Sequence, residues 1–346
     1  MTTHTLDLTA LNAYLASACP QIGEVLEAEK FSGGQSNPTF KLSTSSGVYV
    51  LRRQPPGKLL KSAHAVDREY RVIEALQDTD VPVPNVYHLC KDSDIIGSMF
   101  YIMSFEQGDI FWNSALPEVS RPAVRGAMYD EMNRVLAALH SVDIDKAGLT
   151  DYGKPGNYFS RQLSRWTQQY RASELEHIEE IEQLIGYLEQ NLPEDDGQVS
   201  LVHGDFRLDN MMFDMSNEAR PSVVAVLDWE LSTLGHPYAD LAYQCMQLRL
   251  PADIAHAAGL GGLNREELGI PSEKAYIEAY CKRRNISEIK HWTFYLSFSF
   301  FRLAAIVQGV VKRAHEGNAS SAKAMQLGAM VRPLAQIANK TIYQQG

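Results

Sequence analysis

The sequence HGDFRLDN occupies residues 203–210, and Asp228 follows the apolar run VVAVL at residues 223–227. Asn210 lies five residues after Asp205, and Asp228 lies eighteen residues after Asn210. Phosphoryl transfer from ATP needs a carboxylate that orients the attacking hydroxyl, and it needs oxygen ligands for Mg²⁺. This stretch therefore predicts a catalytic base, Asp205, and two metal ligands, Asn210 and Asp228.

The elements expected around this stretch change in character along the chain. Before Gly108, β-branched and aromatic runs alternate with glycine and proline turns, which predicts short strands and one helix. Beyond Gly108, apolar residues recur three or four positions apart, which predicts long helices. The expected strands are residues 31–37, 38–43, 47–53, 86–90, 98–105, 199–203, 210–213 and 222–228, and the expected helices are residues 63–77, 121–141, 158–172, 175–191, 272–284, 289–315 and 320–342.

Three motifs carry a family resemblance. The spacing H-x-D-x-x-x-x-N at residues 203–210 is that of a kinase catalytic loop, with Gly204 where protein kinases place arginine. Together with VLDWE at residues 226–230 and GHPYADLA at residues 235–242, it resembles the aminoglycoside phosphotransferase/choline kinase-like family. The alternative is an acidic loop that decorates some other α/β fold.

The resemblance implies an α+β, protein-kinase-like bilobal fold. A small antiparallel β-sheet N-lobe would bind the nucleotide at residues 1–105, and a larger, mainly helical C-lobe at residues 106–346 would carry the catalytic and acceptor-binding groups. ATP and Mg²⁺ are the implied cofactors. The family counterparts of His203 and Asp240 brace the catalytic loop and do not take part in the chemistry.

The N-lobe is expected to supply the phosphate contacts. Kinases place a basic residue on a strand and pair it with a helix carboxylate. The run YVLR at residues 49–52 fits this strand, with Val50 over the adenine and Arg52 in place of the usual lysine. Arginine can make the same phosphate contact as a planar fork. Glu69 is its expected helix partner, and a solvated helix charge is the alternative.

Two further segments are expected beside the nucleotide. Glycines permit the backbone turns that let successive amides face an anion, so the loop FSGGQSN at residues 31–37 would cover the phosphates, unless it is a plain hairpin turn. Met103 would line the adenine pocket, and the Ser104 carbonyl and Glu106 amide would bind the base, unless they form an ordinary strand end. From the first loop we expect Gly33, Gly34 and Ser36 at the nucleotide.

The acceptor is expected to be a small molecule, because only twelve positions separate Asp228 from Asp240 and no A-P-E motif follows. The segments at residues 157–166, 55–57 with 62–69, and 300–306 resemble the kinase-like domains associated with acyl-CoA dehydrogenases. That resemblance implies a hydroxyacyl-CoA or hydroxy acid acceptor and a functional link to such a dehydrogenase. Under that resemblance, Arg161, Arg165 and Arg302 would face an anionic acceptor and Trp166 would form an apolar wall, with helix-surface and core packing as the alternative. Separately, Glu230 is a candidate metal ligand through water.

Two other functions stay open at this point. One is a kinase for a cationic alcohol, such as an aminoglycoside or a choline-like compound, which would call for acidic pocket walls. The other is a nucleotide-binding scaffold without catalysis. The departure at Arg52 is the argument for the scaffold, and the complete set of Asp205, Asn210 and Asp228 is the argument against it.

Composition bounds these readings. The chain has 346 residues, of which 45% are hydrophobic, and a formal net charge of −10, which disfavours a nucleic-acid binder. Four dispersed cysteines and the absence of a basic, apolar leader lead us to expect reduced thiols and a cytoplasmic protein. The apolar run at residues 294–311 contains Arg302, so we expect a buried helix and no membrane partner.

Overall fold

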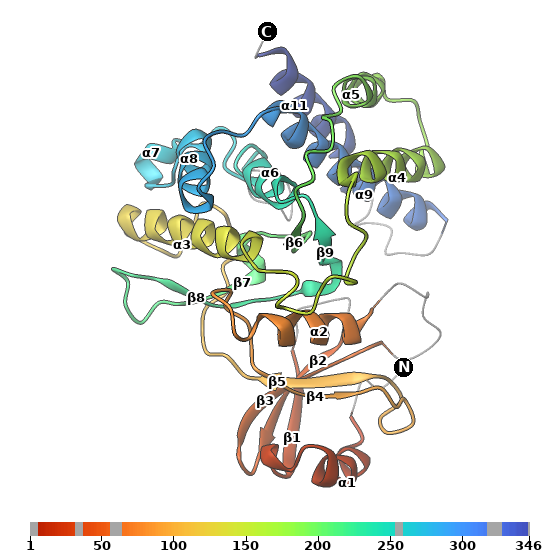
Figure 1. Cartoon of the computed structure of the whole chain (residues 1–346), viewed down its shortest axis with the longest axis vertical. Coiled ribbons are helices and arrows are strands. Elements are labelled where there is room, and N and C mark those ends of the chain that lie inside the picture. Colours follow the sequence, from red (N-terminus) through yellow and green to blue (C-terminus); the bar gives the residue numbers. More distant parts are fainter. Residues whose placement is uncertain (1–5, 32–36, 56–63, 253–258, 317–326, 345–346) are drawn as a thin grey trace.

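The computed structural model describes residues 6–31, 37–55, 64–252, 259–316 and 327–344. Over these residues the chain forms two lobes (Figure 1), a five-stranded antiparallel sheet with two helices and a larger part that is mainly helical. The expected bilobal α+β fold is confirmed. The boundary between residues 105 and 106 stays a prediction; the last strand of the sheet ends at Ser104 and the next helix begins at Pro122.

The N-lobe sheet has the strand order β1-β2-β3-β5-β4. Its central pairing sets Val50 of β3 opposite Met103 of β5, and Arg52 opposite Tyr101. Side chains alternate between the two faces of a strand, so these four residues share one face. The strands are β1 Val25–Lys30, β2 Thr39–Thr44, β3 Gly47–Arg53, β4 Val86–Cys90 and β5 Phe100–Ser104.

The first strand and the first helix depart from the sequence expectation. Most of the strand expected at residues 31–37 lies outside the described residues. Strand β1, which was not expected, ends at Lys30, and its charged, largely exposed residues follow no clear alternation. Helix α1, Leu8–Ala18, was not expected at all; the Asp7 carboxylate caps it by accepting from the Ala10 amide. Helix α1 packs on the opposite face of the sheet from Val50, with Leu11 and Leu15 fully buried.

Helix α2, Val66–Leu76, joins the N-lobe to the C-lobe. The Arg68 guanidinium lies 4.2 Å from the Tyr152 ring centroid and donates to the carbonyl oxygens of Tyr152 and Ser232 at 2.9 and 3.4 Å. In return, the Tyr152 hydroxyl donates to the Arg68 carbonyl at 3.2 Å and lies 2.7 Å from the Ser232 hydroxyl. Arg68 therefore fixes the helix to the C-lobe through both its guanidinium and its backbone carbonyl.

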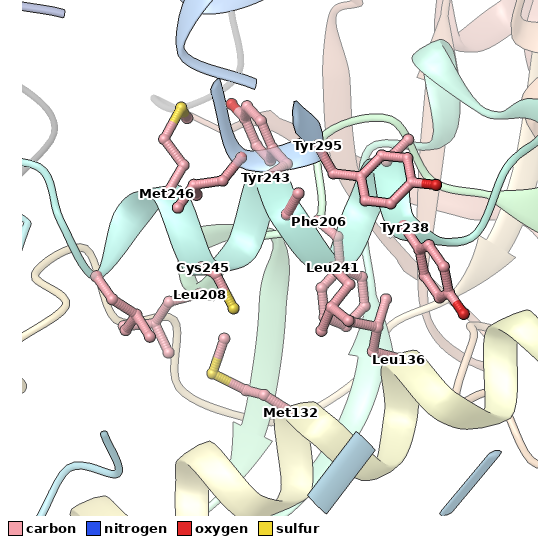
Figure 2. Close-up of a cluster of buried hydrophobic side chains, with 14 of the residues drawn as sticks. Met132, Leu136, Phe206, Leu208, Tyr238, Leu241, Tyr243, Cys245, Met246 and Tyr295 are labelled. Carbon is pink, nitrogen blue, oxygen red and sulfur yellow. The ribbon is translucent and has the colours of Figure 1, made fainter. Parts of the chain in front are cut away.

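The C-lobe is built around helix α6, Tyr238–Gln247, all ten residues of which are buried. Figure 2 shows Leu241 and Cys245 of α6 pointing toward Met132 and Leu136 of α3. Tyr243 lies on the other side of the helix. Helix α6 is buried all round and has no exposed polar face, and it was not among the helices expected from the sequence. The other helices are α3 Pro122–His140, α4 Tyr158–Ser173, α5 Glu179–Gln190, α7 Arg265–Leu268, α8 Glu273–Arg284, α9 Trp292–His315 and α11 Val331–Tyr343.

Two short antiparallel strand pairs lie next to the catalytic stretch in the sequence. Strand β6, Ser200–Val202, pairs with β9, Thr233–Gly235, and β7, Met211–Asp214, pairs with β8, Ser222–Val226. The single turns Leu208–Asn210 and Trp229–Leu231 lie beside them. The HGDFRLDN stretch thus runs from β6 to β7, and Asp228 follows β8.

Helix α9 is long and apolar enough to cross a membrane, but 67% of its most apolar window is buried inside the protein. It packs against α4, α6 and α11 (Figure 1). This agrees with the buried helix expected at residues 289–315. Among the described residues, no other helix meets the same length and hydropathy criteria.

Candidate active site

The loop between β6 and β7 is held by a buried carboxylate. Asp240 of α6, which is 1% exposed, accepts from the backbone amides of His203 at 2.6 Å and Gly204 at 2.9 Å. Burial would raise the pKa of Asp240, but His140, His203 and the Gly204 amide outweigh it and lower that pKa. A negative charge in the core therefore fixes the backbone just before Asp205.

Gly204 is required at its position by both conformation and space. Its φ is +84°, in the region that favours glycine, and an added Cβ would lie 2.8 Å from the carbonyl oxygen of Leu231. The Leu231 backbone belongs to the turn that follows Asp228. Gly204 thus lets the loop carrying Asp205 approach the segment carrying Asp228.

Both carboxylate oxygens of Asp205 are contacted. Tyr243 donates its hydroxyl to Oδ1 at 2.7 Å, and Asn210 donates its Nδ2 to Oδ2 at 3.0 Å. The same Nδ2 also donates to the Asp205 carbonyl at 2.9 Å. Since both Asn210 contacts use the nitrogen, its Oδ1 is the atom that could ligate a metal.

Asp228 is brought to this pair through its neighbour Leu227. The Leu227 amide donates to the Asn210 carbonyl at 2.8 Å, and its carbonyl accepts from Nε2 of His203 at 2.9 Å. His203 therefore braces the loop, as the resemblance implies. Asp228 itself is in the left-handed region, with φ 64° and ψ 60°, and the chain turns sharply there.

Arg52 joins the two lobes through carboxylates. Its Nε and Nη2 donate to Glu69 at 2.7 and 3.1 Å, and Nη2 also donates to Oδ1 of Asp228 at 2.8 Å. Burial alone would lower the pKa of Arg52, but Glu69, Tyr101 and Asp228 outweigh it and raise that pKa. The predicted pair of Arg52 and Glu69 is present, and Glu69 is buried, which rules out the solvated helix charge.

Two buried neutral groups fix Glu69 in turn. Tyr101 donates its hydroxyl to Oε2 at 3.1 Å, and Asn37 donates its Nδ2 to Oε1 at 3.0 Å. Buried charges are tolerated where such partners surround them. No local pattern indicates these two partners, because they come from separate parts of the N-lobe.

The residues expected to contact the adenine lie on the same face of the N-lobe sheet as Arg52. Val50 and Met103 pair across β3 and β5 and are 6% and 8% exposed. Ser104 ends β5, and its hydroxyl contacts the Glu106 carboxylate. Their binding of the base stays a prediction. Gly33, Gly34 and Ser36 lie outside the described residues, as do residues 56–63.

A group of acidic side chains fits a divalent cation. One carboxylate oxygen from each of Glu69, Asp228 and Glu230 lies within 4.8 Å of the others. Because Arg52 already binds both oxygens of Glu69, we expect Asp228 and Asn210 to provide the direct ligands, with Glu230 beside them. Carboxylate and amide oxygens are the donor types that Mg²⁺ prefers, so these residues fit the ion.

Arg302 reaches the catalytic loop with Trp166 and Arg165 in a row behind it, whereas Arg161 does not join this group. Arg302 of α9 donates to the Gly204 carbonyl at 2.8 Å, and its guanidinium carbon lies 5.6 and 5.8 Å from the ring centroids of Tyr243 and Trp166. Arg165 lies 5.5 Å from the same Trp166 ring. Arg161 instead donates to the carbonyls of Lys154 and Pro155, which tie it to the loop before its own helix.

Sequence reasoning missed two residues that contact Asp205. Tyr243 lies on α6, which was not among the expected helices, so its tyrosine was not expected at the site. Arg207 lies inside the catalytic stretch, and its Nε is 3.4 Å from Oδ2 of Asp205. A cation two positions after the expected base was a signal that could have been used.

A bilobal α+β fold with a braced catalytic loop of this kind defines the class of kinase-like proteins. The chain belongs to the phosphotransferase enzyme family, whose model matches residues 27–275. Among curated proteins it is 46% identical over 313 residues to acyl-CoA dehydrogenase family member 10 of Mus musculus, covering 90% of this chain and 29% of that protein. It is 44% identical over 338 residues to family member 11 of Rattus norvegicus, covering 96% and 43%. The chain thus spans less than half the length of these relatives.

Solved structures agree with the fold. A protein from Ralstonia eutropha JMP134, provisionally described as an aminoglycoside phosphotransferase, superimposes with a TM-score of 0.89 and 46% identity, covering 98% of this chain and 99% of that chain. A mutant of aminoglycoside phosphotransferase APH(4)-Ia, in complex with AMP-PNP and hygromycin B, has a TM-score of 0.62 and 16% identity, covering 96% and 98%. The second likeness shows the fold alone.

Proposed function

We propose that the chain is a Mg²⁺-dependent phosphotransferase that moves the γ-phosphoryl group of ATP to a hydroxyl of a small hydroxyacyl compound, a hydroxyacyl-CoA or hydroxy acid. The observation that carries the proposal is the joining of Asp205, Asn210 and Asp228 into one hydrogen-bonded unit with Arg52 and Glu69. This unit contains a carboxylate for the acceptor, oxygen atoms for a metal and a cation for phosphates.

The proposed reaction needs orientation and charge compensation more than covalent chemistry. Asp205 accepts a hydrogen bond from the acceptor hydroxyl and takes its proton as the hydroxyl oxygen bonds to the γ-phosphorus. The bond between that phosphorus and the bridging oxygen breaks, and ADP leaves with the electron pair. Tyr243 and Asn210 hold the two oxygens of Asp205, so the carboxylate meets the hydroxyl in a fixed orientation.

The remaining groups bind the nucleotide. Arg52, held by Glu69, would contact the α- and β-phosphates, and Val50 and Met103 would contact the adenine. Asn210 and Asp228 would hold Mg²⁺, which neutralises charge on the phosphate oxygens. In the described structure Arg52 also donates to Asp228, so its guanidinium and the cation would share that carboxylate.

The surroundings of Asp205 support an anionic, partly apolar acceptor. Arg302 and Arg165 flank Trp166, and Arg302 reaches the backbone of the catalytic loop. A cationic acceptor such as an aminoglycoside calls for acidic walls, whereas an acyl thioester or carboxylate calls for cations and aromatic surface. The similarity to acyl-CoA dehydrogenase family members supports the same choice, and a functional link to such a dehydrogenase belongs to this proposal.

The test is a coupled ADP-release assay with a panel of acceptors: hydroxy acids, hydroxyacyl-CoA thioesters, choline and aminoglycosides. We expect turnover on hydroxyacyl compounds, and none with Asp205→Asn or Asp228→Ala. Activity restricted to aminoglycosides would overturn the acceptor assignment. ATP-dependent phosphorylation retained in both variants would overturn the catalytic assignment.

A further inference from the structure

His64 lies just before helix α2 and has no role in the site as described so far. It belongs to the segment at residues 62–69, one of those that resemble the kinase-like domains associated with acyl-CoA dehydrogenases. Its φ is +63°, an uncommon conformation for a residue with a side chain, and one that costs free energy. Nε2 of Gln54 and the backbone amide of Val66 both donate to the His64 carbonyl oxygen at 2.9 Å. These two bonds hold the strained residue, and with it the direction of its ring.

The ring of His64 is joined to Asn37, the last residue of the expected phosphate loop. Nδ1 of the ring lies 3.1 Å from Oδ1 of Asn37. Asn37 is fully buried, and its Nδ2 donates to Oε1 of Glu69 at 3.0 Å. A carboxylate only accepts hydrogen bonds, so the amide nitrogen of Asn37 faces Glu69 and its oxygen faces His64. Because an amide oxygen also only accepts, Nδ1 of His64 carries a proton and is the donor.

Glu69 connects this chain of hydrogen bonds to Arg52. Its Oε1 accepts from Asn37 at 3.0 Å and from Nη2 of Arg52 at 3.1 Å. Its Oε2 accepts from Nε of Arg52 at 2.7 Å and from the Tyr101 hydroxyl at 3.1 Å. Each oxygen therefore has two donors, which fix the plane of the carboxylate. A guanidinium forms a two-pronged pair only with a carboxylate in a matching plane, so an Asn37 amide that turned away would loosen the hold on Arg52.

We infer that His64 is a positioning residue for the phosphate-binding cation. Its ring orients the amide of Asn37, and that amide holds the Glu69 carboxylate against Arg52. This inference rests on the proposed function, in which Arg52 binds the α- and β-phosphates of the nucleotide. It accounts for the strained backbone, because the left-handed conformation of His64 accompanies the contact of Nδ1 with Asn37. His64 acts through its neighbours and does not itself touch the nucleotide.

A structural role is the rival explanation: the contact between His64 and Asn37 could serve only to attach the start of α2 to the sheet. The variant His64→Gly separates the two explanations. Glycine adopts this φ without strain, so the variant relieves the backbone while it removes the ring. A ring that only attaches the helix would change stability alone, whereas a ring that positions the cation would also change nucleotide affinity.

The experiment uses the full chain, with titration calorimetry for Mg·ADP affinity and urea unfolding for stability. We expect His64→Gly to bind Mg·ADP about fivefold more weakly, as for the loss of one hydrogen bond beside a charged pair. The KM for Mg·ATP should rise by a similar factor, while kcat stays within about twofold, because Asp205 and the metal ligands are untouched. The midpoint of urea unfolding should change little, since the relief of strain opposes the loss of the ring.

The matched control for this comparison is His291→Gly. His291 also has a left-handed backbone, with φ +57°, directly before helix α9, and its side chain is exposed. The two variants therefore make the same chemical change at the same kind of position. We expect His291→Gly to leave both the Mg·ADP affinity and the KM for Mg·ATP unchanged.

A double-mutant cycle tests the path through Asn37. In an Asn37→Ala background, His64→Gly should cause no further loss of Mg·ADP affinity. Added imidazole should restore affinity to His64→Gly but not to the double variant, and the response of His64→Gly decides the question should Asn37→Ala fail to fold. Full affinity in His64→Gly, losses that add in the double variant, or an affinity that imidazole leaves unrestored would overturn the inference. An unmodified chain that binds no Mg·ADP would instead overturn the proposed function.

Discussion

The hydroxyl of Tyr243 donates a 2.7 Å hydrogen bond to Oδ1 of Asp205, and so joins the buried helix α6 directly to the expected base. Burial and the Asp205 charge raise the pKa of Tyr243, so the phenol stays protonated and remains a donor across the working range of pH. The guanidinium of Arg302 lies over the same ring. One tyrosine therefore contacts both the expected base and Arg302, which we expect to face the acceptor.

We expect Tyr243→Phe to lower kcat for phosphoryl transfer about tenfold, because Asp205 loses one of the bonds that orient it. The KM for ATP should change little, since no phosphate contact is removed. Steady-state kinetics with varied ATP measure both. Tyr129→Phe is the control, because it removes an equally short bond, 2.7 Å to the Ser114 carbonyl, that does not involve Asp205. Equal losses of kcat in the two variants would contradict the role of Tyr243.

Gly204→Ala should destabilise the chain more than Gly97→Ala. Both glycines have φ +84°, so the conformational strain of about 1–2 kcal/mol is common to the two variants. Only at Gly204 would the added Cβ meet backbone, 2.8 Å from the Leu231 carbonyl oxygen, whereas nothing lies within 4 Å at Gly97. Chemical denaturation of both variants measures the difference. A free energy of unfolding that falls by the same amount in both would show that the two loops can move apart freely.

Arg52→Lys should retain folding and lose nucleotide affinity. A lysine cannot reproduce the two-pronged contact with Glu69 and reach Asp228 as well, so we expect the KM for Mg·ATP to rise about tenfold. Arg53→Lys, at the next position of the same strand, alters a guanidinium that contacts the Phe40 ring and the Ile96 carbonyl. It should leave the KM unchanged. Titration calorimetry with Mg·ADP would provide the same comparison without turnover.

Acid should weaken the fold through two buried histidines. Burial lowers the pKa of both His140 and His236 below the unfolded value of about 6.5. As the pH falls below that value, the unfolded chain binds more protons than the folded chain. The free energy of unfolding is therefore highest above about pH 6.5 and decreases below it. Urea unfolding at about pH 7.5 and about pH 5.5 measures the slope.

The matched variants for this slope are His236→Asn and His177→Asn. His236 is buried against Tyr295 and Phe159, so its replacement should make the acid slope shallower. His177 is exposed, and its replacement should leave the slope as it is. A slope that is the same in all three chains would assign the acid sensitivity to other groups.

The parts of the fold that the sequence predicts are those with a local signal. The strand bearing Arg52 and the helix bearing Glu69 show their own periodicities, and the catalytic stretch has a fixed spacing. Helix α6 was not expected; it is short and every one of its residues is buried. Strand β1 was not expected, because its residues are charged and largely exposed and show no alternation.

The site shows the same limit. Asp205, Asn210 and Asp228 follow from spacing, but Tyr243 and Arg302 reach the loop from helices that are distant in sequence. Such contacts depend on how helices pack, which no local pattern records. Arg161 was grouped with Arg165 because of proximity in sequence. In the structure they make different contacts: Arg161 donates to the loop before its helix, and Arg165 lies against the Trp166 ring.

The docking of helix α2 by Arg68 and Tyr152 bears on how this phosphotransferase would be controlled. In protein kinases, a displacement of the corresponding helix separates its glutamate from the phosphate-binding cation and stops catalysis. Here Arg68 and Tyr152 hold the helix against the opposite lobe, with Glu69 already beside Arg52. Flux through the reaction would then follow the supply of nucleotide and acceptor.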